Sequence, residues 1–436
     1  MRTLIQAFRT KELRNKILFT LALIVIYRVG AFIPTPGVDY KAVHACIAKT
    51  TSGNFVGLIN LFSGGSLLQL SIFALGVMPY ITASIVVELL RVVIPRFEAL
   101  HKEGQAGEAK LTQYTRYMTI GLALLQSATI LVTARSGALF DYACASNVIP
   151  NGSVINLIIM VLVMTGGTGL IMWMAELITD KGIGQGMSVL IFISICAGFL
   201  PKLWDIGREN GWMKFGIVMA VLVSIIIFII FVEQSQRRIP VQYTRRMIGR
   251  KMYGGTSTYI PLKINMSGVI PPIFASSILA IPTLIAEFGK SDQSWVKWIN
   301  ANLGNTTSVW YICLYAVMIV FFTFFYTSIT FNPDDVSDDM KQYGGFIPGI
   351  RAGKETSEYL TYVMNRLDTV GSIYLLFVCL IPTVLIMALG LGNSLPFGGT
   401  TILIIAGVGL DTLRQAAAQV QQYQYTSFLQ PAPNTK

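Results

Sequence analysis

Residues 60–90 read NLFSGGSLLQLSIFALGVMPYITASIVVELL. The part after Gly76 continues to about Pro95 and has the length and apolarity of one membrane crossing. The part before Gly76 is too short to cross a bilayer and too apolar to lie in water. It predicts a half-helix inside a helical bundle, because broken backbone at membrane depth is tolerated where protein buries it or where it lines a cavity. A helix lying on the outer membrane surface is the alternative interpretation.

The composition places this stretch in a membrane protein. The chain has 436 residues, of which 53% are hydrophobic and 13% are charged, and its mean hydropathy is +0.60. A soluble globular domain has about 25% charged residues. A soluble globular enzyme and a disordered chain are therefore both excluded, and an all-α polytopic membrane protein is the expected fold class.

Ten apolar windows are each close to the length of about 20 residues that a helix needs to cross a bilayer. The uncharged run 369–410 contains a cluster of Gly, Asn, Ser and Pro between Gly390 and Gly399, which predicts a hairpin of two crossings. Pro34 and Pro36 follow the first apolar segment, where a cleavage site needs small residues, so no cleaved signal peptide is expected. The predicted crossings are residues 16–33, 76–95, 117–134, 152–175, 182–201, 215–232, 264–286, 309–331, 369–389 and 400–420.

Lysine and arginine are distributed unevenly between the two sides of the predicted membrane. One side carries 24 of the 33 basic residues and the other carries 8, while Arg28 falls inside the first crossing. The positive-inside rule places the first side in the cytoplasm. Both termini, residues 1–16 and the tail 421–436, are then cytoplasmic. Arg28 is expected to snorkel or to pair rather than to bind a substrate.

No catalytic, metal or cofactor site is expected, and the chain is predicted not to be an enzyme. Residues 289–291 (GKS) resemble the end of a P-loop, but Leu284 stands where that loop needs its first glycine. His44 and His101 fall on opposite sides of the predicted membrane. Cys46 and Cys144 both lie in predicted outside loops, which leaves a disulfide between them open.

Acidic residues are scarce inside the crossings. The candidates are Glu88, Glu176 and Asp411, which all fall near the ends of crossings or near a basic partner. A secondary transporter for a small solute usually keeps ionisable or unwound sites at the midplane. That class is therefore the weaker interpretation, although it remains the alternative to a channel.

The loop 233–263 is basic and carries Glu233 as its one acid. Its composition fits either topology determination with contact to anionic lipids, or a docking surface for an acidic or RNA-bearing partner. A short hairpin that turns at Gly254 and Gly255 is predicted within it. The basic residues assigned to docking are Arg237, Arg238, Arg245, Arg246, Arg250 and Lys251.

The loop 332–368 has the opposite balance, with seven acidic and four basic residues. The positive-inside rule does not require such a composition, so partner binding is favoured over a solvated connector. Its Gly- and Pro-rich tip at 344–354 is expected to present Arg351 outward.

Six ordered stretches of this chain resemble the SecY family, the pore-forming subunits of the Sec protein translocon. The chain departs from the usual family residues at Glu88, Ala175, Gln185 and Ala352, and its tail after Tyr423 is unlike the usual basic end. The resembling stretches are 60–90, 113–118 (QYTRYM), 173–188 (WMAELITDKGIGQGMS), 261–277 (PLKINMSGVIPPIFASS), 331–354 and 396–400 (PFGGT).

The resemblance implies an hourglass channel built from two inverted pseudo-repeat halves, residues 17–201 and 202–420. A plug at about 60–72 would seal its outer side, with Leu61, Phe62, Ser63, Gly64, Gly65, Ser66, Leu67 and Leu68. An apolar pore ring would consist of Val77, Ile81, Met187, Ile191, Ile273 and Ile404. A lateral gate would include Thr82, Gln126 and Asn265.

The resemblance also implies partners and a location. The two cytoplasmic loops would dock the SecA ATPase and the ribosome, with Arg351 the residue most closely tied to the motor. SecE and SecG would be the small membrane subunits, and unfolded preproteins with their signal peptides would be the clients. The expected location is the plasma membrane, where anionic lipids would contact the basic loop.

Overall fold

The computed structural model describes most of the chain. Of the predicted site residues, Leu61, Phe62, Arg245 and Arg250 lie outside the described part, as does Cys144. The described residues are 11–47, 63–135, 148–150, 153–243, 246–248, 251–253, 257–288, 293–304, 308–389 and 399–429.

A helix occupies each of the ten predicted crossing windows. Long runs of apolar residues without internal breaks explain most of them, since a membrane leaves the backbone no other partner than its own carbonyls. Their bounds are α2 Lys11–Gly30, α5 Met78–Val93, α7 Gln105–Arg135, α9 Val154–Lys181, α10 Gly186–Asn210, α11 Trp212–Gln234, α12 Ile270–Phe288, α14 Val309–Thr330, α16 Lys354–Leu389 and α17 Gly399–Leu429.

Within the described residues, seven of these helices are long and apolar enough to span a membrane, namely α7, α9, α10, α11, α14, α16 and α17. An eighth candidate is the pair of α5 and α6 (Pro95–Lys102), which bends by 97°. α12 is an apolar helix over Ile270–Leu279, and α2 begins with charged residues. The polytopic all-α class is confirmed, and α2 and α12 remain predicted crossings.

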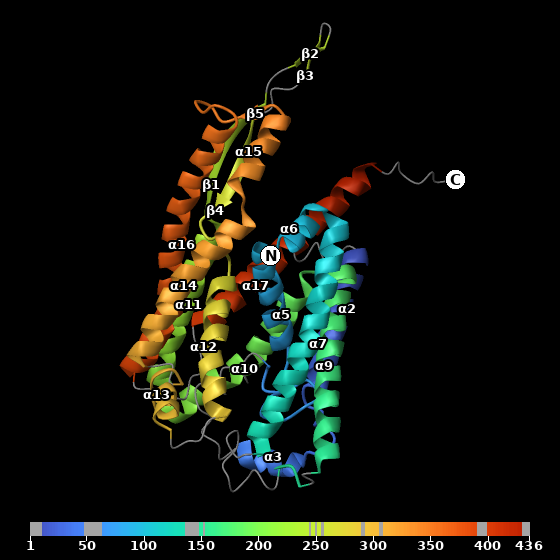
Figure 1. Ribbon diagram of the computed structural model, residues 1–436, viewed down its shortest axis with the longest axis vertical. Coiled ribbons are helices and arrows are strands. Elements are labelled where there is room, and N and C mark those ends of the chain that lie inside the picture. Colours follow the sequence, from blue (N-terminus) through green and yellow to red (C-terminus); the bar gives the residue numbers. More distant parts are fainter. Residues whose placement is uncertain are drawn as a thin grey trace, which may run out of the picture.

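The helices form two groups joined through α10 and α17 (Figure 1). In one group α5 packs on α7, α7 on α9, and α2 on α9; in the other α12 packs on α14, α14 on α16, and α11 on α16. α10 packs on α9, α11 and α17, so it links the groups. Between α5 or α7 and α12 or α14, the described backbones do not pack with comparable closeness. The two helix groups are therefore connected by close packing through α10 and α17. The boundary between α5 or α7 and α12 or α14, where such packing is lacking, is called here the seam.

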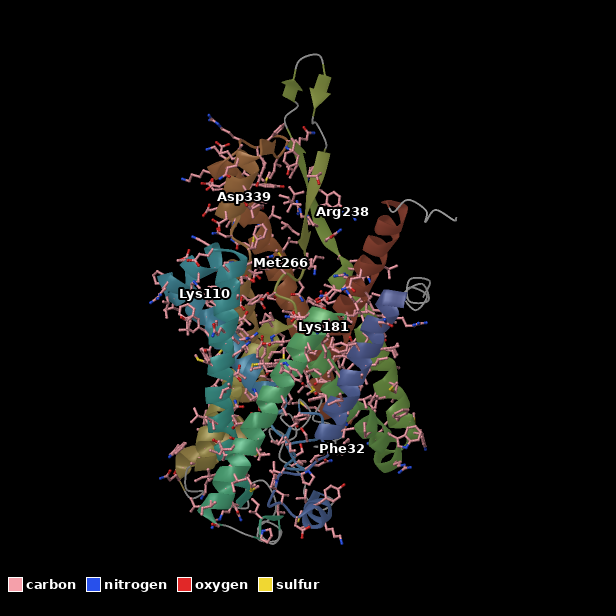
Figure 2. All side chains as sticks on the ribbon, turned by 90° about the vertical axis from the view of Figure 1, so that its right-hand side faces the viewer. Phe32, Lys110, Lys181, Arg238, Met266 and Asp339 are labelled. Atoms are coloured by element: carbon pink, nitrogen blue, oxygen red, sulfur yellow. The ribbon has the colours of Figure 1, made fainter. Side chains whose placement is uncertain are left out.

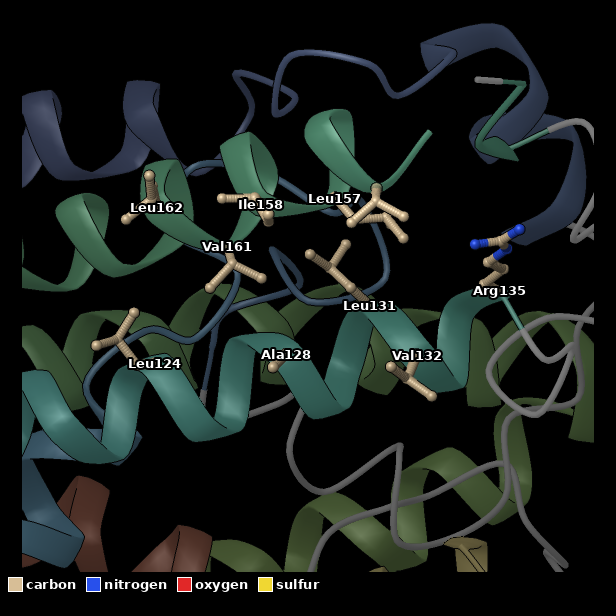
Figure 3. A pocket seen from close by; sticks show the side chains of 10 residues that line it. Leu124, Ala128, Leu131, Val132, Arg135, Leu157, Ile158, Val161 and Leu162 are labelled. Carbon is tan, nitrogen blue, oxygen red and sulfur yellow. The ribbon is translucent and has the colours of Figure 1, made fainter. Parts of the chain in front are cut away.

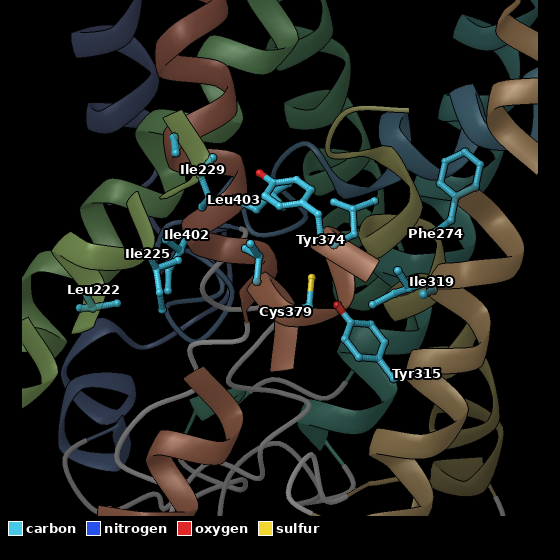
Figure 4. Packing of buried hydrophobic residues seen from close by; sticks show 14 of the residues in the cluster. Leu222, Ile225, Ile229, Phe274, Tyr315, Ile319, Tyr374, Cys379, Ile402 and Leu403 are labelled. Atoms are coloured by element: carbon cyan, nitrogen blue, oxygen red, sulfur yellow. The ribbon is translucent and has the colours of Figure 1, made fainter. Parts of the chain in front are cut away.

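The second group has a large apolar core (Figure 4). Phe274 of α12 packs edge-on against Phe322 of α14, with ring centroids 5.6 Å apart. Ile85 of α5 belongs to the same buried cluster, so this apolar core includes a helix of the first group. Five helices of this half contribute residues shown in Figure 4, among them Leu222, Ile225, Ile229, Tyr315, Ile319, Tyr374, Cys379, Ile402 and Leu403.

The segment 63–77, called here the plug segment, is not a helix. It runs as consecutive turns, and Gly64, Gly65, Leu70 and Gly76 all have positive φ, which a right-handed helix cannot accommodate. The predicted half-helix is therefore wrong for the described residues. The segment is largely buried, so the alternative of a helix on the membrane surface is wrong as well.

Strands extend from one end of the helical bundle, called here the sheet end (Figure 1). β1 (Gln236–Tyr243) pairs antiparallel with β4 (Ser257–Lys263) on one side and with β5 (Gly345–Phe346) on the other. The two large loops thus share one sheet. β2 (Arg246–Ile248) and β3 (Lys251–Tyr253) form a separate hairpin beyond it.

The predicted turn at Gly254 and Gly255 lies outside the described residues. In the described part of this loop, Ile248 of β2 pairs with Lys251 of β3. A Gly follows Ile248 in the sequence as well, and the composition of the loop does not distinguish the two glycine positions. The β1–β4 pair makes the hairpin much longer than predicted.

The opposite end of the bundle carries two short helices, α3 (Tyr40–Ile47) and α13 (Ser294–Asn302) (Figure 1). Cys46, in α3, is disulfide-bonded, and Cys196, Cys313 and Cys379 are free. Cys144, for which a disulfide with Cys46 was left open, lies outside the described residues.

Candidate pore, gate and docking surfaces

The middle of the plug segment, at Leu70 and Ile72, is hydrogen-bonded to the chain that leaves α2. Thr35 donates from its backbone N (3.0 Å) and from Oγ1 (2.8 Å) to the Leu70 carbonyl, and the Ile72 N–H donates to the Ile33 carbonyl over 3.0 Å. Ser66 Oγ lies 2.9 Å from the Phe73 carbonyl oxygen. These bonds satisfy buried backbone groups that a helix would otherwise satisfy, so the segment is stable without helical structure.

The predicted plug residues within the described part are buried or half-buried. Ser63, Ser66 and Leu67 expose 0%, 1% and 2% of their surface, and Gly64 and Gly65 are half-buried. Leu68 packs in an apolar cluster with Leu70, Leu131 and other residues. The prediction that this stretch lies within the bundle agrees with this burial.

The six predicted ring residues come together in two adjoining apolar clusters. Val77 and Met187 are buried in one cluster, and Ile273 and Ile404 are buried in the other. Ile81 and Ile191 pack against both clusters. The ring therefore draws on α5, α10, α12 and α17, and on the residue that precedes α5, so it includes helices from both groups.

The physical character of this meeting point is apolar. Val77 and Ile81 are four residues apart, as are Met187 and Ile191, so each pair presents two side chains along one side of its segment. A narrow constriction lined by such side chains excludes water and ions because it dewets. Plain core packing has the same residue pattern, and what distinguishes this cluster is that it joins two helix groups around a turn-rich buried segment.

The three predicted gate residues do not form one cluster. Thr82 on α5 donates to its own helix, to the Met78 carbonyl over 2.6 Å, and Gln126 is half-buried on α7. Asn265 is 3% exposed and bonds to Glu233 of α11 over 2.7 Å. Thr82 and Gln126 thus belong to the α5–α7 side of the seam, and Asn265 belongs to the other helix group.

β1 has exposed basic residues near its start and buried apolar residues further along the strand. Arg237 and Arg238 of β1 are exposed, and the Arg238 guanidinium lies 4.8 Å from the centre of the Tyr259 ring. Ile239 and Val241 of the same strand are buried. They join an apolar cluster with Leu262, Met340, Ile347, Leu360 and Val363. Arg246 and Lys251 lie on β2 and β3.

An acidic helix packs against these buried apolar residues. α15 (Pro333–Gln342) begins after Asn332, whose Oδ1 accepts from the Asp334 N–H at 3.1 Å and whose Nδ2 donates to Asp335 Oδ2 at 2.8 Å. Such a cap satisfies a helix donor that has no partner in the helix. Acidic residues in the first turn also suit the helix dipole. Sequence reasoning missed α15, although the Asn-Pro-Asp-Asp start is a readable cap signal.

The tip that carries Arg351 is tied to this assembly, called here the sheet platform (β1, β4, β5, α15 and residues 347–353). Ser337 Oγ donates to the Gly353 carbonyl over 2.7 Å, and Thr356 Oγ1 donates to the Arg351 carbonyl over 2.8 Å. The Arg351 side chain itself is exposed. Figure 2 shows Arg238 and Asp339 toward the sheet end and Phe32 toward the opposite end.

Two grooves on the first helix group have none of the predicted ring residues among their lining residues. One groove of about 710 Å³ lies between α7 and α9, with apolar walls and Arg135 at one end (Figure 3). A second, of about 470 Å³, lies between α5, α6 and α7 and has no ionisable lining residue other than Tyr114 and Tyr117. Neither resembles a polar midplane site for a small solute.

Comparison with known proteins gives closely similar relatives. A sequence model of the SecY family matches residues 71–413. The protein translocase subunit SecY of Streptomyces scabiei is 56% identical over 430 residues, covering 97% of this chain and 98% of that protein. The protein of the same name from Mycobacterium tuberculosis strain H37Rv is 52% identical over 437 residues, covering 98% of this chain and 99% of that protein.

Solved structures share the fold at low sequence identity. A protein-conducting channel superposes with a TM-score of 0.59 at 16% identity, covering 93% of this chain and 92% of the other. Sec61 from the canine ribosome–channel complex of the endoplasmic reticulum gives 0.58 at 15% identity with the same coverage. The identity to the bacterial relatives, over nearly the whole of both chains, decides the assignment: this chain belongs to the SecY family of protein translocase subunits.

Proposed function

We propose that this chain is the central channel subunit of a protein translocase. It passes unfolded secretory chains across the plasma membrane and releases membrane-protein helices sideways into the bilayer. The observation that carries this function is the apolar meeting point of Ile81, Ile191, Ile273 and Ile404 between the two helix groups. The membership of the SecY family supports it, and it favours a channel over a secondary transporter.

The buried plug segment and the apolar ring act together as the seal in this proposal. An idle channel of this kind must hold back ions while it stays able to widen for a polypeptide. Apolar side chains suit this task because they exclude water when they are close and bind no part of a passing chain strongly. The seam between α5 or α7 and α12 or α14 is the proposed lateral gate, since these helices do not pack on one another as closely as neighbouring helices within each group.

The sheet platform is the proposed docking surface for the partners that supply energy. The chain itself is proposed not to be an enzyme, so a SecA-type ATPase or a translating ribosome drives transport. Exposed arginine suits phosphate and carboxylate groups, and Arg237, Arg238 and Arg351 are all exposed. The small subunits SecE and SecG, signal peptides and anionic lipids complete the proposed set of partners, and both termini are proposed to be cytoplasmic.

Reconstitution distinguishes the two function classes. Vesicles that contain the chain with its co-purifying membrane subunits are supplied with a preprotein, SecA and ATP, and protease protection of the preprotein is measured. The proposal expects protected preprotein only when ATP is present. Accumulation of a small solute along an ion gradient, without any protected preprotein, would establish the transporter instead.

A further inference from the structure

Arg28 contacts the plug segment directly. Its Nη1 donates to the Gly64 carbonyl over 3.1 Å, and its guanidinium lies 5.3 Å from the centre of the Phe32 ring. No carboxylate in the described part of the chain lies within ion-pair distance of it. An arginine within a predicted crossing is costly unless it finds such polar partners, so the Gly64 carbonyl accounts for how its charge is accommodated.

We propose that Arg28 is a positioning residue that holds the plug segment in its closed place. The inference rests on the proposed channel function and adds a residue that acts on the seal. The guanidinium donates to a backbone carbonyl, so the bond depends on the position of the segment and not on any plug side chain. Moving the plug segment away from α2 breaks this bond and leaves Arg28 to be solvated by water in the opened path.

The backbone at Gly64 favours glycine and brings this residue close to Arg28. Its φ is +68°, and a Cβ atom there would lie 2.9 Å from Arg28 Nη1 and 3.2 Å from the Ser194 Cα. Any side chain at this position is strained by its backbone conformation and also meets the guanidinium. Glycine is therefore required both by the turn and by the close approach of α2 and α10.

Tyr27, the residue before Arg28 in α2, links this part of α2 to α10. Tyr27 OH lies 2.6 Å from Ser194 Oγ, and the Tyr27 ring stacks on Phe73 of the plug segment at a centroid distance of 5.8 Å. Ser194 lies three residues after Ile191, a ring residue on the same helix. An outward movement of α10 that widens the ring would therefore disturb Tyr27, Arg28 and Gly64 together.

Ion leak through the idle complex tests the proposal. Arg28→Met keeps the length of the side chain and removes the donor, Arg28→Lys keeps the charge and a donor, and Arg135→Met is the matched control at an exposed arginine near the end of α7. Conductance without preprotein is measured in planar bilayers for the complex with its co-purifying subunits. Loss of one hydrogen bond to a charged group predicts a rise of about tenfold to a hundredfold for Arg28→Met, a smaller rise for Arg28→Lys and none for Arg135→Met.

A second variant keeps the test decisive if Arg28→Met folds poorly. Gly64→Ala leaves Arg28 in place and is expected to raise the leak, and the double variant is expected to leak no more than the leakier single variant, because both remove one contact. A leak in Arg28→Met no larger than in Arg135→Met, or leaks that multiply in the double variant, overturns the proposal. Failure of the unmodified complex to transport preprotein would instead contradict the proposed function, so the two failures are distinguishable.

Discussion

Asn265 donates from Nδ2 to Glu233 Oε1 over 2.7 Å and thereby joins the segment before α12 to the end of α11. The same amide donates to the Gly268 carbonyl over 3.1 Å, and its Oδ1 accepts from Ser267 Oγ over 3.1 Å. A residue predicted for the lateral gate is thus held within its own helix group. At the seam proposed as the gate, the described side chains of the buried core, such as Ile85, are apolar.

Removing the Asn265 amide is expected to destabilise the fold. Asn265→Ala leaves the half-buried Glu233 carboxylate without this donor, which should lower the free energy of unfolding by about 1–3 kcal/mol. Asn265→Asp should lower it further, because two carboxylates would then face each other. Equilibrium unfolding in detergent measures both. The control is Asn302→Ala, where the lost bond to the Trp298 carbonyl is exposed, and an equal loss in control and test variants would contradict this account.

A polar side chain in the ring is expected to make the idle channel conduct. Ile81→Asn places an amide where two apolar clusters meet, and the amide favours a wetted path by about 1–3 kcal/mol, or about tenfold or more in conductance. Ile81→Leu should leave the ion conductance unchanged. Leu125→Asn, on a side chain that is 68% exposed, should also leave it unchanged in planar-bilayer recordings, and equal conductance of Ile81→Asn and Leu125→Asn would argue against the ring.

Helix positions were the part of the fold that the sequence predicted well. A crossing of a bilayer requires a long apolar run, so the ten windows were readable and each contains a helix. The non-helical conformation of the plug segment could not be predicted in this way, because its turns depend on hydrogen bonds to distant residues such as Thr35 and Ile33. Composition indicated that the stretch is unusual and left its conformation undetermined.

The strand pairing between the two loops could not be predicted from the sequence either. β5 is two residues long, and its partner β1 lies about a hundred residues earlier. No local sequence pattern therefore predicts that these two strands pair. The ring residues have the four-residue spacing of ordinary core packing, and only the family resemblance singled them out. Arg28 was predicted to snorkel or pair, whereas its partner is a backbone carbonyl that leaves no signal in the sequence.

Charge reversal at Arg351 is expected to block motor-driven export while the fold remains intact. The loop is held through the Arg351 carbonyl by Thr356, so Arg351→Glu changes the exposed charge without removing that bond. Export in reconstituted vesicles should fall about tenfold or more, since placing like charges together at an interface costs several kcal/mol. Lys354→Glu, at a side chain that is 90% exposed, is the control, and normal export by Arg351→Glu would contradict the docking role.

Truncating the core of the sheet platform is expected to loosen both loops together. Ile347 is 3% exposed and packs with Val241 and Leu262, so Ile347→Ala should cost about 2–5 kcal/mol of local stability. Hydrogen exchange should then rise in β1 as well as in α15. Tyr343→Ala, at a 75% exposed side chain, should leave exchange unchanged. Faster exchange confined to α15 in Ile347→Ala would show that the loops are independent.

The central claim is that a polypeptide passes through the apolar meeting point of the two helix groups. A photo-crosslinking residue is placed at Ile81, at Ile191 and, as a control, at Leu125, and a secretory chain is stalled during transport. Adducts at Ile81 and Ile191 with none at Leu125 are the predicted result. A stalled, protease-protected chain that forms no adduct at Ile81 or Ile191 would contradict the account.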